Sequence, residues 1–194
     1  MSAVPSQPDP AALGYHGLRM RADDYFALGE TQERYQLVDG VVLMSPRPST
    51  FHQMIVRLVQ KQLEAHADAH PGACFFPDVD LQLTPTLVYA PDLVCYNPGR
   101  LHGFPVRLTT PPDLVIEVLS PGSKAFDLTT KRDDYEKHGI GEYWTYDPDD
   151  SRLRTYRRRE GLLLDETARG DSAAAEALHG FVLDLRPLRA ISAR

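Results

Sequence analysis

The segment Leu114-Val115-Ile116-Glu117-Val118-Leu119 decides the fold of this chain, because it is an apolar run interrupted by a single acid. A run of this length predicts a strand that is covered on both faces, as in the middle of a sheet. In a strand, Glu117 shares one face with Val115, while Ile116 points to the other. Burying Glu117 without a partner would cost free energy or raise its pKa until the carboxyl group became neutral.

Two interpretations of Glu117 follow. Either it forms a salt bridge with one of the 17 arginines, or it binds a cation or a substrate. A second acid, Asp92, directly follows Pro91 at another predicted strand. Two carboxylates brought together repel each other unless a divalent cation lies between them, and oxygen ligands of this kind suit Mg²⁺. Zinc is the weaker alternative: His66 and His70 have i, i+4 spacing, but no HExxH pattern surrounds them.

Short strands and two helices are predicted around this segment. Asp39-Gly40 between residues 34–38 and 41–44 predicts a β-hairpin, since a type I′ turn needs positive φ at both central positions. Helical spacing of apolar residues predicts a helix from Thr50 to Ala69, with Thr50 and Gln53 as a capping box.

Two further helices are predicted, one over 19–28 and one over 127–138 with Asp127 as its cap. Strands are predicted over 73–76 and 79–83, which could form one bent strand, over 88–96, and in an antiparallel meander over 143–146, 152–158 and 162–166. The chain then continues with a loop or weak helix over 168–179 and an apolar segment over 181–185. This order predicts an α+β fold with one mixed sheet, helices packed on it and an N-terminal β-hairpin.

Length and composition set further bounds. The 194 residues predict one domain over 18–194, and three prolines within 1–17 predict a flexible tail. A net charge of −6 argues against a protein whose whole surface is cationic, and Cys74 and Cys95 are too few for a disulfide scaffold. We expect no membrane association and a cytoplasmic location, because the sequence shows neither a span of about 20 apolar residues nor a signal peptide.

Five stretches, in a fixed order, resemble one known family. They are Tyr35–Gly40 with Met44-Ser45-Pro46 and His52, then Pro91-Asp92, then Pro112–Pro121, then Asp127–Tyr135, and finally Gly139–Pro148. Together they look like the Uma-two family of bacterial endonucleases, within the PD-(D/E)xK restriction-endonuclease-like superfamily. The resemblance covers roughly residues 20–190 and implies a restriction-endonuclease-like core.

The resemblance implies catalytic roles for Asp92 and Glu117, which together with the Val118 carbonyl would hold Mg²⁺ or Mn²⁺. The superfamily motif has a lysine two residues after the second acid, where this chain has Leu119. The family pattern has a lysine at Lys131, so Lys131 is the expected replacement, and Lys124 is the alternative. A solvated helix face is the plainer interpretation of Lys131.

Six further positions are candidate accessories or surface contacts. Gln36 stands where the family usually has a glutamate, which would weaken metal binding, and His52 could hold a phosphate or a carboxylate, or fix the helix N-terminus. Tyr135 shares the helix face of Lys131, although core packing is its favoured role. On the predicted strand over 152–158, one face carries Arg152, Arg154 and Arg158, which could bind along a phosphate backbone. Alternatively, their charge keeps an edge strand soluble.

The sequence therefore predicts a metal-dependent endonuclease that hydrolyses phosphodiester bonds in nucleic acid, DNA being the favoured substrate. The alternative is a catalytically decayed nucleic-acid-binding or scaffold protein on the same fold, which Leu119 and Gln36 favour. An acyl hydrolase has little support, since no G-x-S-x-G motif is present and Cys74 and Cys95 read as packing residues. By analogy with nucleases that cut duplex DNA, a homodimer is expected.

Overall fold

The structure is a computed structural model that describes residues 14–29, 31, 33–103 and 105–192. The predicted tail over 1–17 lies outside the described residues as far as residue 13. The chain divides into two compact units, one formed by Met1–Arg47 and Gln82–Tyr89, the other by Pro48–Leu81 and Ala90–Arg194. One domain over 18–194 stays a prediction, and the two units are described separately.

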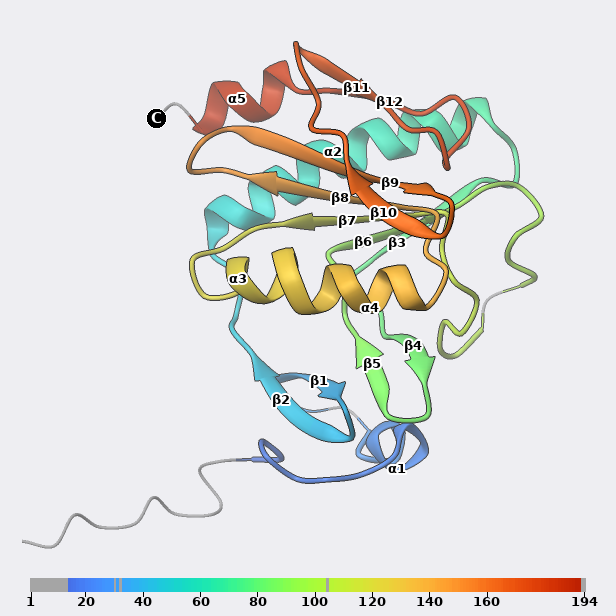
Figure 1. Ribbon diagram of the computed structural model, residues 1–194, viewed down its shortest axis with the longest axis vertical. Coiled ribbons are helices and arrows are strands. Elements are labelled where there is room, and N and C mark those ends of the chain that lie inside the picture. Colours follow the sequence, from blue (N-terminus) through green and yellow to red (C-terminus); the bar gives the residue numbers. More distant parts are fainter. Residues whose placement is uncertain (1–13, 30, 32, 104, 193–194) are drawn as a thin grey trace, which may run out of the picture. The chain divides into compact units, whose positions relative to one another are not determined.

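The first unit contains a four-stranded sheet in the order β2-β1-β5-β4 (Figure 1). Its elements are α1 (Ala22–Ala27), β1 (Arg34–Val38), β2 (Val41–Ser45), β4 (Leu81–Thr84) and β5 (Leu87–Tyr89). The predicted hairpin is confirmed: β1 pairs antiparallel with β2, and both Asp39 (φ 50°) and Gly40 (φ 74°) have positive φ. Leu37, Val42 and Val88 form a small core with Tyr35 and Ala22.

The second unit contains a six-stranded mixed sheet in the order β10-β9-β8-β7-β6-β3. Its strands are β3 (Cys74–Pro77), β6 (Leu93–Tyr96), β7 (Leu114–Val118), β8 (Glu142–Asp147), β9 (Arg152–Arg159) and β10 (Leu162–Asp165). Only β7 and β8 pair in parallel. All five residues of β7 are buried, which confirms a strand covered on both faces.

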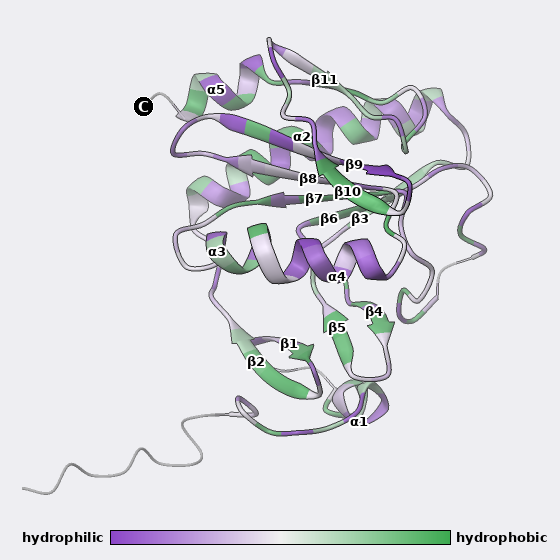
Figure 2. Ribbon diagram, in the orientation of Figure 1, coloured by the Kyte–Doolittle hydropathy of each residue, from purple (hydrophilic) through white to green (hydrophobic). Residues whose placement is uncertain are grey.

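Helices cover both faces of this sheet (Figure 1). The crossover between β7 and β8 runs through α3 (Lys124–Phe126), a π-helical segment η2 (Asp127–Lys131) and α4 (Arg132–Lys137). A parallel pair needs such a crossover connection. The other face carries α2 (Thr50–Ala69), α5 (Arg186–Ser192) and the hairpin of β11 (Ser172–Ala174) and β12 (Val182–Asp184), with Ile116, Trp144 and Phe181 in the core between them. Figure 2 shows α4 as largely hydrophilic, whereas β5 is hydrophobic.

The predicted helix from Thr50 to Ala69 is confirmed, but its predicted cap is wrong. Ser49 is the N-cap: its backbone is extended (φ −71°, ψ 162°), and its side-chain oxygen accepts a hydrogen bond from the His52 amide at 3.1 Å. Thr50 is already helical and so cannot take the cap position, which requires non-helical backbone.

Several other predictions need correction. The two units hold separate sheets, so the hairpin does not belong to one mixed sheet. The predicted bent strand over 73–83 is two strands, β3 and β4, in different sheets, and the segment over 88–96 likewise divides between β5 and β6. The region 168–179 contains β11, and α5 was not expected. The sheet to which β3, β5 or β6 belongs depends on partners distant in sequence, so local pattern did not reveal it.

Candidate active site

Asp92 and Glu117 lie next to each other across neighbouring strands of the second unit. Asp92 directly precedes β6 and Glu117 lies on β7, and these strands pair antiparallel. Each carboxylate is held by the backbone of the other segment. Val118 N donates to Asp92 Oδ2 at 2.8 Å, and Asp92 N donates to Glu117 Oε2 at 3.2 Å. The two acids thus share one buried position, with side chains 12% and 5% exposed.

Lys131 reaches this pair from the crossover helix. Its Nζ donates to Glu117 Oε1 at 2.8 Å and lies 2.9 Å from Asp127 Oδ1, one helical turn earlier. The Lys131 side chain is only 6% exposed, so it is not on a solvated helix face. Leu119, where the superfamily motif has a lysine, is itself buried.

Asp127 is the residue whose place sequence reasoning missed. It was expected to cap a helix beginning there, but the helix begins earlier, at Lys124, and Asp127 lies within it. Its buried carboxylate pairs with Lys131, and its carbonyl accepts a hydrogen bond from Tyr143 Oη at 3.2 Å. The i, i+4 spacing of Asp127 and Lys131 was the available signal for this pair.

His52 lies on the first turn of α2 and points to the same two strands. Its Nε2 is 3.1 Å from Asp92 Oδ2 and 3.0 Å from the Val118 carbonyl oxygen. A protonated Nε2 donates to both oxygens, which are two of the three predicted metal ligands. His52 Nδ1 is buried and has no hydrogen-bond partner among the described residues.

Burial and charge shift the pKa values of these groups in opposite directions. Burial raises the pKa of Glu117, and the nearby Asp92 and Asp127 add to this against the opposing charge of Lys131. Burial would also raise the pKa of Asp92, but the hydrogen bond and charge of His52, the hydrogen bond from Val118 N and the charge of Lys131 together outweigh it and lower that pKa.

The two basic groups respond in the reverse way. Burial would lower the pKa of Lys131, but the charges of Glu117 and Asp127 raise it, so the ammonium stays protonated. Burial likewise opposes protonation of His52, but the hydrogen bond and charge of Asp92 raise its pKa. The cluster therefore holds three carboxyl groups and two basic groups in one buried place.

The oxygens of this cluster fit a hard divalent cation. The Asp92 and Glu117 carboxylates and the Val118 carbonyl are the ligand types that Mg²⁺ and Mn²⁺ prefer. Asp92 and Val118 are already joined to each other and to His52. Three carboxyl groups against two basic groups leave the cluster able to accept further positive charge.

Two other predicted accessories occupy different surroundings. Tyr135 is buried, its ring packs at 5.0 Å from that of Tyr143, and its Oη lies 3.4 Å from Glu117 Oε1, so it both packs and touches the cluster. Lys124 does not reach Glu117. Its Nζ lies 2.6 Å from the carboxylate of Asp147, which is buried at the end of β8.

Gln36 belongs to the first unit, on β1, where its side-chain amide donates to Ser45 Oγ. Its carbonyl oxygen Oε1 is buried without a hydrogen-bond partner among the described residues. That Gln36 weakens metal binding stays a prediction.

The arginines of β9 are engaged by other groups of the chain. Arg152 pairs with Asp150 and Arg154 with Asp147, both at 3.7 Å. The Arg158 guanidinium donates to the carbonyl oxygens of four residues: Tyr135, Glu136, Ile140 and Gly161. Much of the local positive charge seen in the sequence is therefore balanced within the fold.

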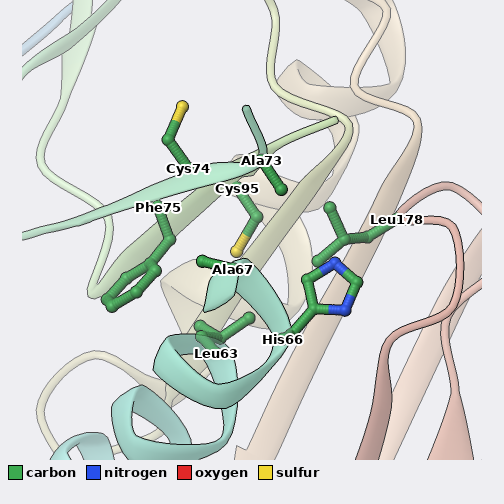
Figure 3. A pocket seen from close by; sticks show the side chains of 8 residues that line it. All are labelled: Leu63, His66, Ala67, Ala73, Cys74, Phe75, Cys95 and Leu178. Atoms are coloured by element: carbon green, nitrogen blue, oxygen red, sulfur yellow. The ribbon is translucent and has the colours of Figure 1, made fainter. Parts of the chain in front are cut away.

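His66 and His70 stack on each other near the end of α2, with ring centroids 4.2 Å apart. Within the described ranges, no three His, Cys, Asp or Glu side chains are grouped to hold a metal ion, and the zinc alternative stays a prediction. His66 instead lines an apolar pocket with Leu63, Phe75 and Leu178 (Figure 3).

Cys74 and Cys95 flank the same pocket but point in different directions (Figure 3). Burial raises the pKa of both thiols, most strongly that of Cys95, which keeps them in the unreactive thiol form. This agrees with a packing role. None of the helices in the described part of the chain is long and apolar enough to cross a membrane.

Asp92 beside β6, Glu117 on the neighbouring β7 and Lys131 nearby form the arrangement that the sequence resemblance implies for a restriction-endonuclease-like nuclease. Comparison with known proteins agrees with this class. Residues 22–186 match the model of the Uma2 family, described as "Putative restriction endonuclease", and the chain belongs to this family. No curated protein matches the chain.

A solved structure has the same fold. It is the crystal structure of "a putative nuclease belonging to DUF820 from Anabaena variabilis ATCC 29413". The TM-score is 0.76 at 19% sequence identity, and the match covers 89% of this chain and 99% of that one. The restriction-endonuclease-like α+β fold predicted from the sequence is thereby confirmed.

Proposed function

We propose that this chain is a metal-dependent endonuclease that hydrolyses phosphodiester bonds in nucleic acid, with DNA as its substrate. The observation that carries the proposal is the buried cluster in which Asp92 and Glu117 meet and Lys131 Nζ lies 2.8 Å from Glu117. Membership of the Uma2 family supports the same class of reaction.

In this proposal, Asp92, Glu117 and the Val118 carbonyl hold Mg²⁺ or Mn²⁺. When bound, the ion supplies Lewis-acid activation of the scissile phosphate. Lys131 contributes a fixed positive charge that stabilises the negative charge developing on the phosphate. Because its pKa is raised, Lys131 is better suited to this role than to removing a proton from the attacking water. His52 orients Asp92 through its Nε2.

The test is nicking of supercoiled plasmid DNA by the purified protein with Mg²⁺ or Mn²⁺. We expect Asp92→Ala and Glu117→Ala each to lower the rate at least about 100-fold, and EDTA to abolish it. Asp133→Asn is the matched control, since the Asp133 side chain is 54% exposed and pairs with Arg132 on the surface. Equal nicking by wild type and both site variants would refute the assignment.

Calorimetric titration with Mg²⁺ separates this proposal from a decayed site, the alternative that Leu119 and Gln36 favour. An active site binds Mg²⁺ in the wild type and loses binding in Glu117→Ala. A wild type that binds neither Mg²⁺ nor Mn²⁺ would favour a scaffold or binding role instead.

Two further parts of the proposal concern the state of the protein. We propose a homodimer, since two symmetry-related sites can cut both strands of a duplex, and sedimentation of the full chain measures its mass directly. A cytoplasmic location is proposed with it, to be checked by fractionation of cells that express the protein.

A further inference from the structure

The N-terminal half of α2 combines exposed cations, exposed apolar side chains and direct contact with the candidate active site. His52 is on its first turn, and the neighbouring Phe51 and Met54 are 41% and 50% exposed. Arg57 and Lys61 follow on the helix and are also exposed. The opposite side of the helix is buried, with Ile55 and Val59 in the core. His52 lies on that buried side, so the exposed residues share the end of the helix with it but not its face.

The charge of this helix face differs from that of β9. Residues 50–63 contain no Asp or Glu, and Arg57 and Lys61 form no ion pair with any described residue. The first acid on this side is Glu64, which ends the cationic part of the face. In contrast, Arg157 and Arg159 of β9 are shared among three glutamates: Glu142, Glu166 and Glu176. A polyanion would find free positive charge on α2 and compensated charge on β9.

The spacing on the helix suits a nucleic-acid strand. Arg57 and Lys61 are four residues apart, so their Cβ atoms lie about 6 Å from each other on one side of the helix. At a rise of about 1.5 Å per residue, Lys61 lies about 14 Å along the axis from His52. Successive phosphates of one strand of B-DNA are about 3.4 Å apart along its axis, so the face can follow about four nucleotides.

We propose that this α2 face, formed by Phe51, Met54, Arg57 and Lys61, binds the part of the nucleic-acid strand that runs past the N-terminal end of α2, outside the candidate active site. Arg57 and Lys61 bind phosphates, and Phe51 and Met54 pack against a base or sugar. The proposal rests on the proposed nuclease function, since it takes nucleic acid as the ligand and starts from the position of His52.

Binding is measured in EDTA, by anisotropy of a fluorescein-labelled 20-nucleotide DNA, its duplex and the RNA of the same sequence. We expect Arg57→Gln/Lys61→Gln to bind at least about tenfold more weakly at 0.1 M salt. Its plot of log affinity against log salt should be less steep by about 1.8 for the duplex, because two phosphate contacts are lost. Phe51→Ala should weaken binding to the single strand about fivefold or more without changing the slope.

The matched control is Lys137→Gln/Arg186→Gln, which changes the net charge equally at two exposed, ion-paired positions whose side chains are 69% and 73% exposed. The proposal is overturned if the control loses as much affinity as the α2 variant, if the α2 variant binds like the wild type, or if the wild type binds none of the three probes.

Failure of this proposal can be told apart from failure of the nuclease function. If the wild type nicks plasmid DNA and Arg57→Gln/Lys61→Gln does so with unchanged KM, the α2 surface is wrong and the function stands. If the α2 variant loses binding while the wild type does not nick, the surface stands and catalysis does not.

Discussion

Glu117 is held by three residues at once. One oxygen accepts from Lys131 and lies near Tyr135 on the crossover helix, while the other accepts from the backbone amide of Asp92. A buried carboxylate with this many partners is fixed in position before any ligand arrives. Removing one partner therefore changes stability as well as chemistry.

Lys131→Met should destabilise the protein by about 3–5 kcal/mol, because it leaves Glu117 and Asp127 buried without their shared cation. It should also remove nicking activity beyond what unfolding explains. Denaturant titration, followed by activity measured where the variant is still folded, checks both effects.

Lys137→Met is the control for this substitution, since the Lys137 side chain is 69% exposed and makes a long surface pair with Asp134. Its stability should stay close to that of the wild type. A Lys131→Met variant that is as stable and as active as this control would contradict the role of Lys131.

At the residue scale, more of the candidate site can be predicted from the sequence than the incomplete PD-(D/E)xK motif suggests. Glu117 was detectable because an acid in an apolar run has to be explained, and Lys131 because the chain has only four lysines. The contact of His52 with both Asp92 and Val118 was not predictable, since it joins α2 to two strands that are 40 and 66 residues away. The ion pair of Asp127 and Lys131 does not follow from the predicted helix, which begins at residue 127 with Asp127 as its cap, whereas the observed helical segment begins at Lys124.

At the scale of elements, α2 links the core to the candidate site. Its buried face packs through Ile55, Val59 and Leu63, and its first turn carries His52. The Ser49 cap holds the His52 amide, so the end of the helix and the position of the imidazole are coupled through one hydrogen bond.

Ser49→Ala should therefore lower the free energy of unfolding by about 1 kcal/mol, the usual loss for an N-cap side chain. Thr50→Ala is the matched control and should cost much less, because Thr50 is exposed and does not cap the helix. Chemical denaturation of both variants decides the matter. A larger loss from Thr50→Ala would restore the capping box predicted from the sequence.

Elements with local signals were predicted well, and elements defined by distant partners were not. The Asp39-Gly40 hairpin, the apolar β7 and the meander of β8, β9 and β10 all follow from local turns and periodicity. The assignment of β4 and β5 to a different sheet from β3 and β6 depends on pairing between remote segments. The alanine-rich region around β11 lacks the alternation that marks a strand.

At the scale of the whole molecule, net charge proved less informative than the pairing of charges. The chain carries −6 overall, yet the acids are used to hold arginines in place on β9 and to build a buried cluster around Lys131. The binding of a polyanion then depends on the few basic side chains that form no ion pair with these acids.

Global stability should depend on pH through His66. Burial, with the charge of His70, lowers the pKa of His66 below the ordinary value of 6.5. The unfolded chain then binds more protons than the folded one just below pH 6.5, so this contribution is fully present above that pH and is lost as the pH falls through the folded pKa.

The measurement is the melting temperature between pH 7.5 and pH 5. His66→Leu should show a smaller fall over this range than the wild type. His102→Leu, which removes an exposed imidazole, serves as the control. An equal fall in wild type and His66→Leu would show that His66 does not contribute.

The π-helical segment Asp127–Lys131 has a consequence for anyone who wishes to engineer this protein for heat resistance. A π turn carries one residue more than an α turn, and such segments are rare and found mainly at functional sites. Deleting a residue there to restore a regular helix would rotate Lys131 by about 100° relative to the preceding turn and remove it from Glu117. A change that raised heat resistance in this segment would therefore disrupt the candidate site, so stabilising substitutions belong elsewhere in the chain.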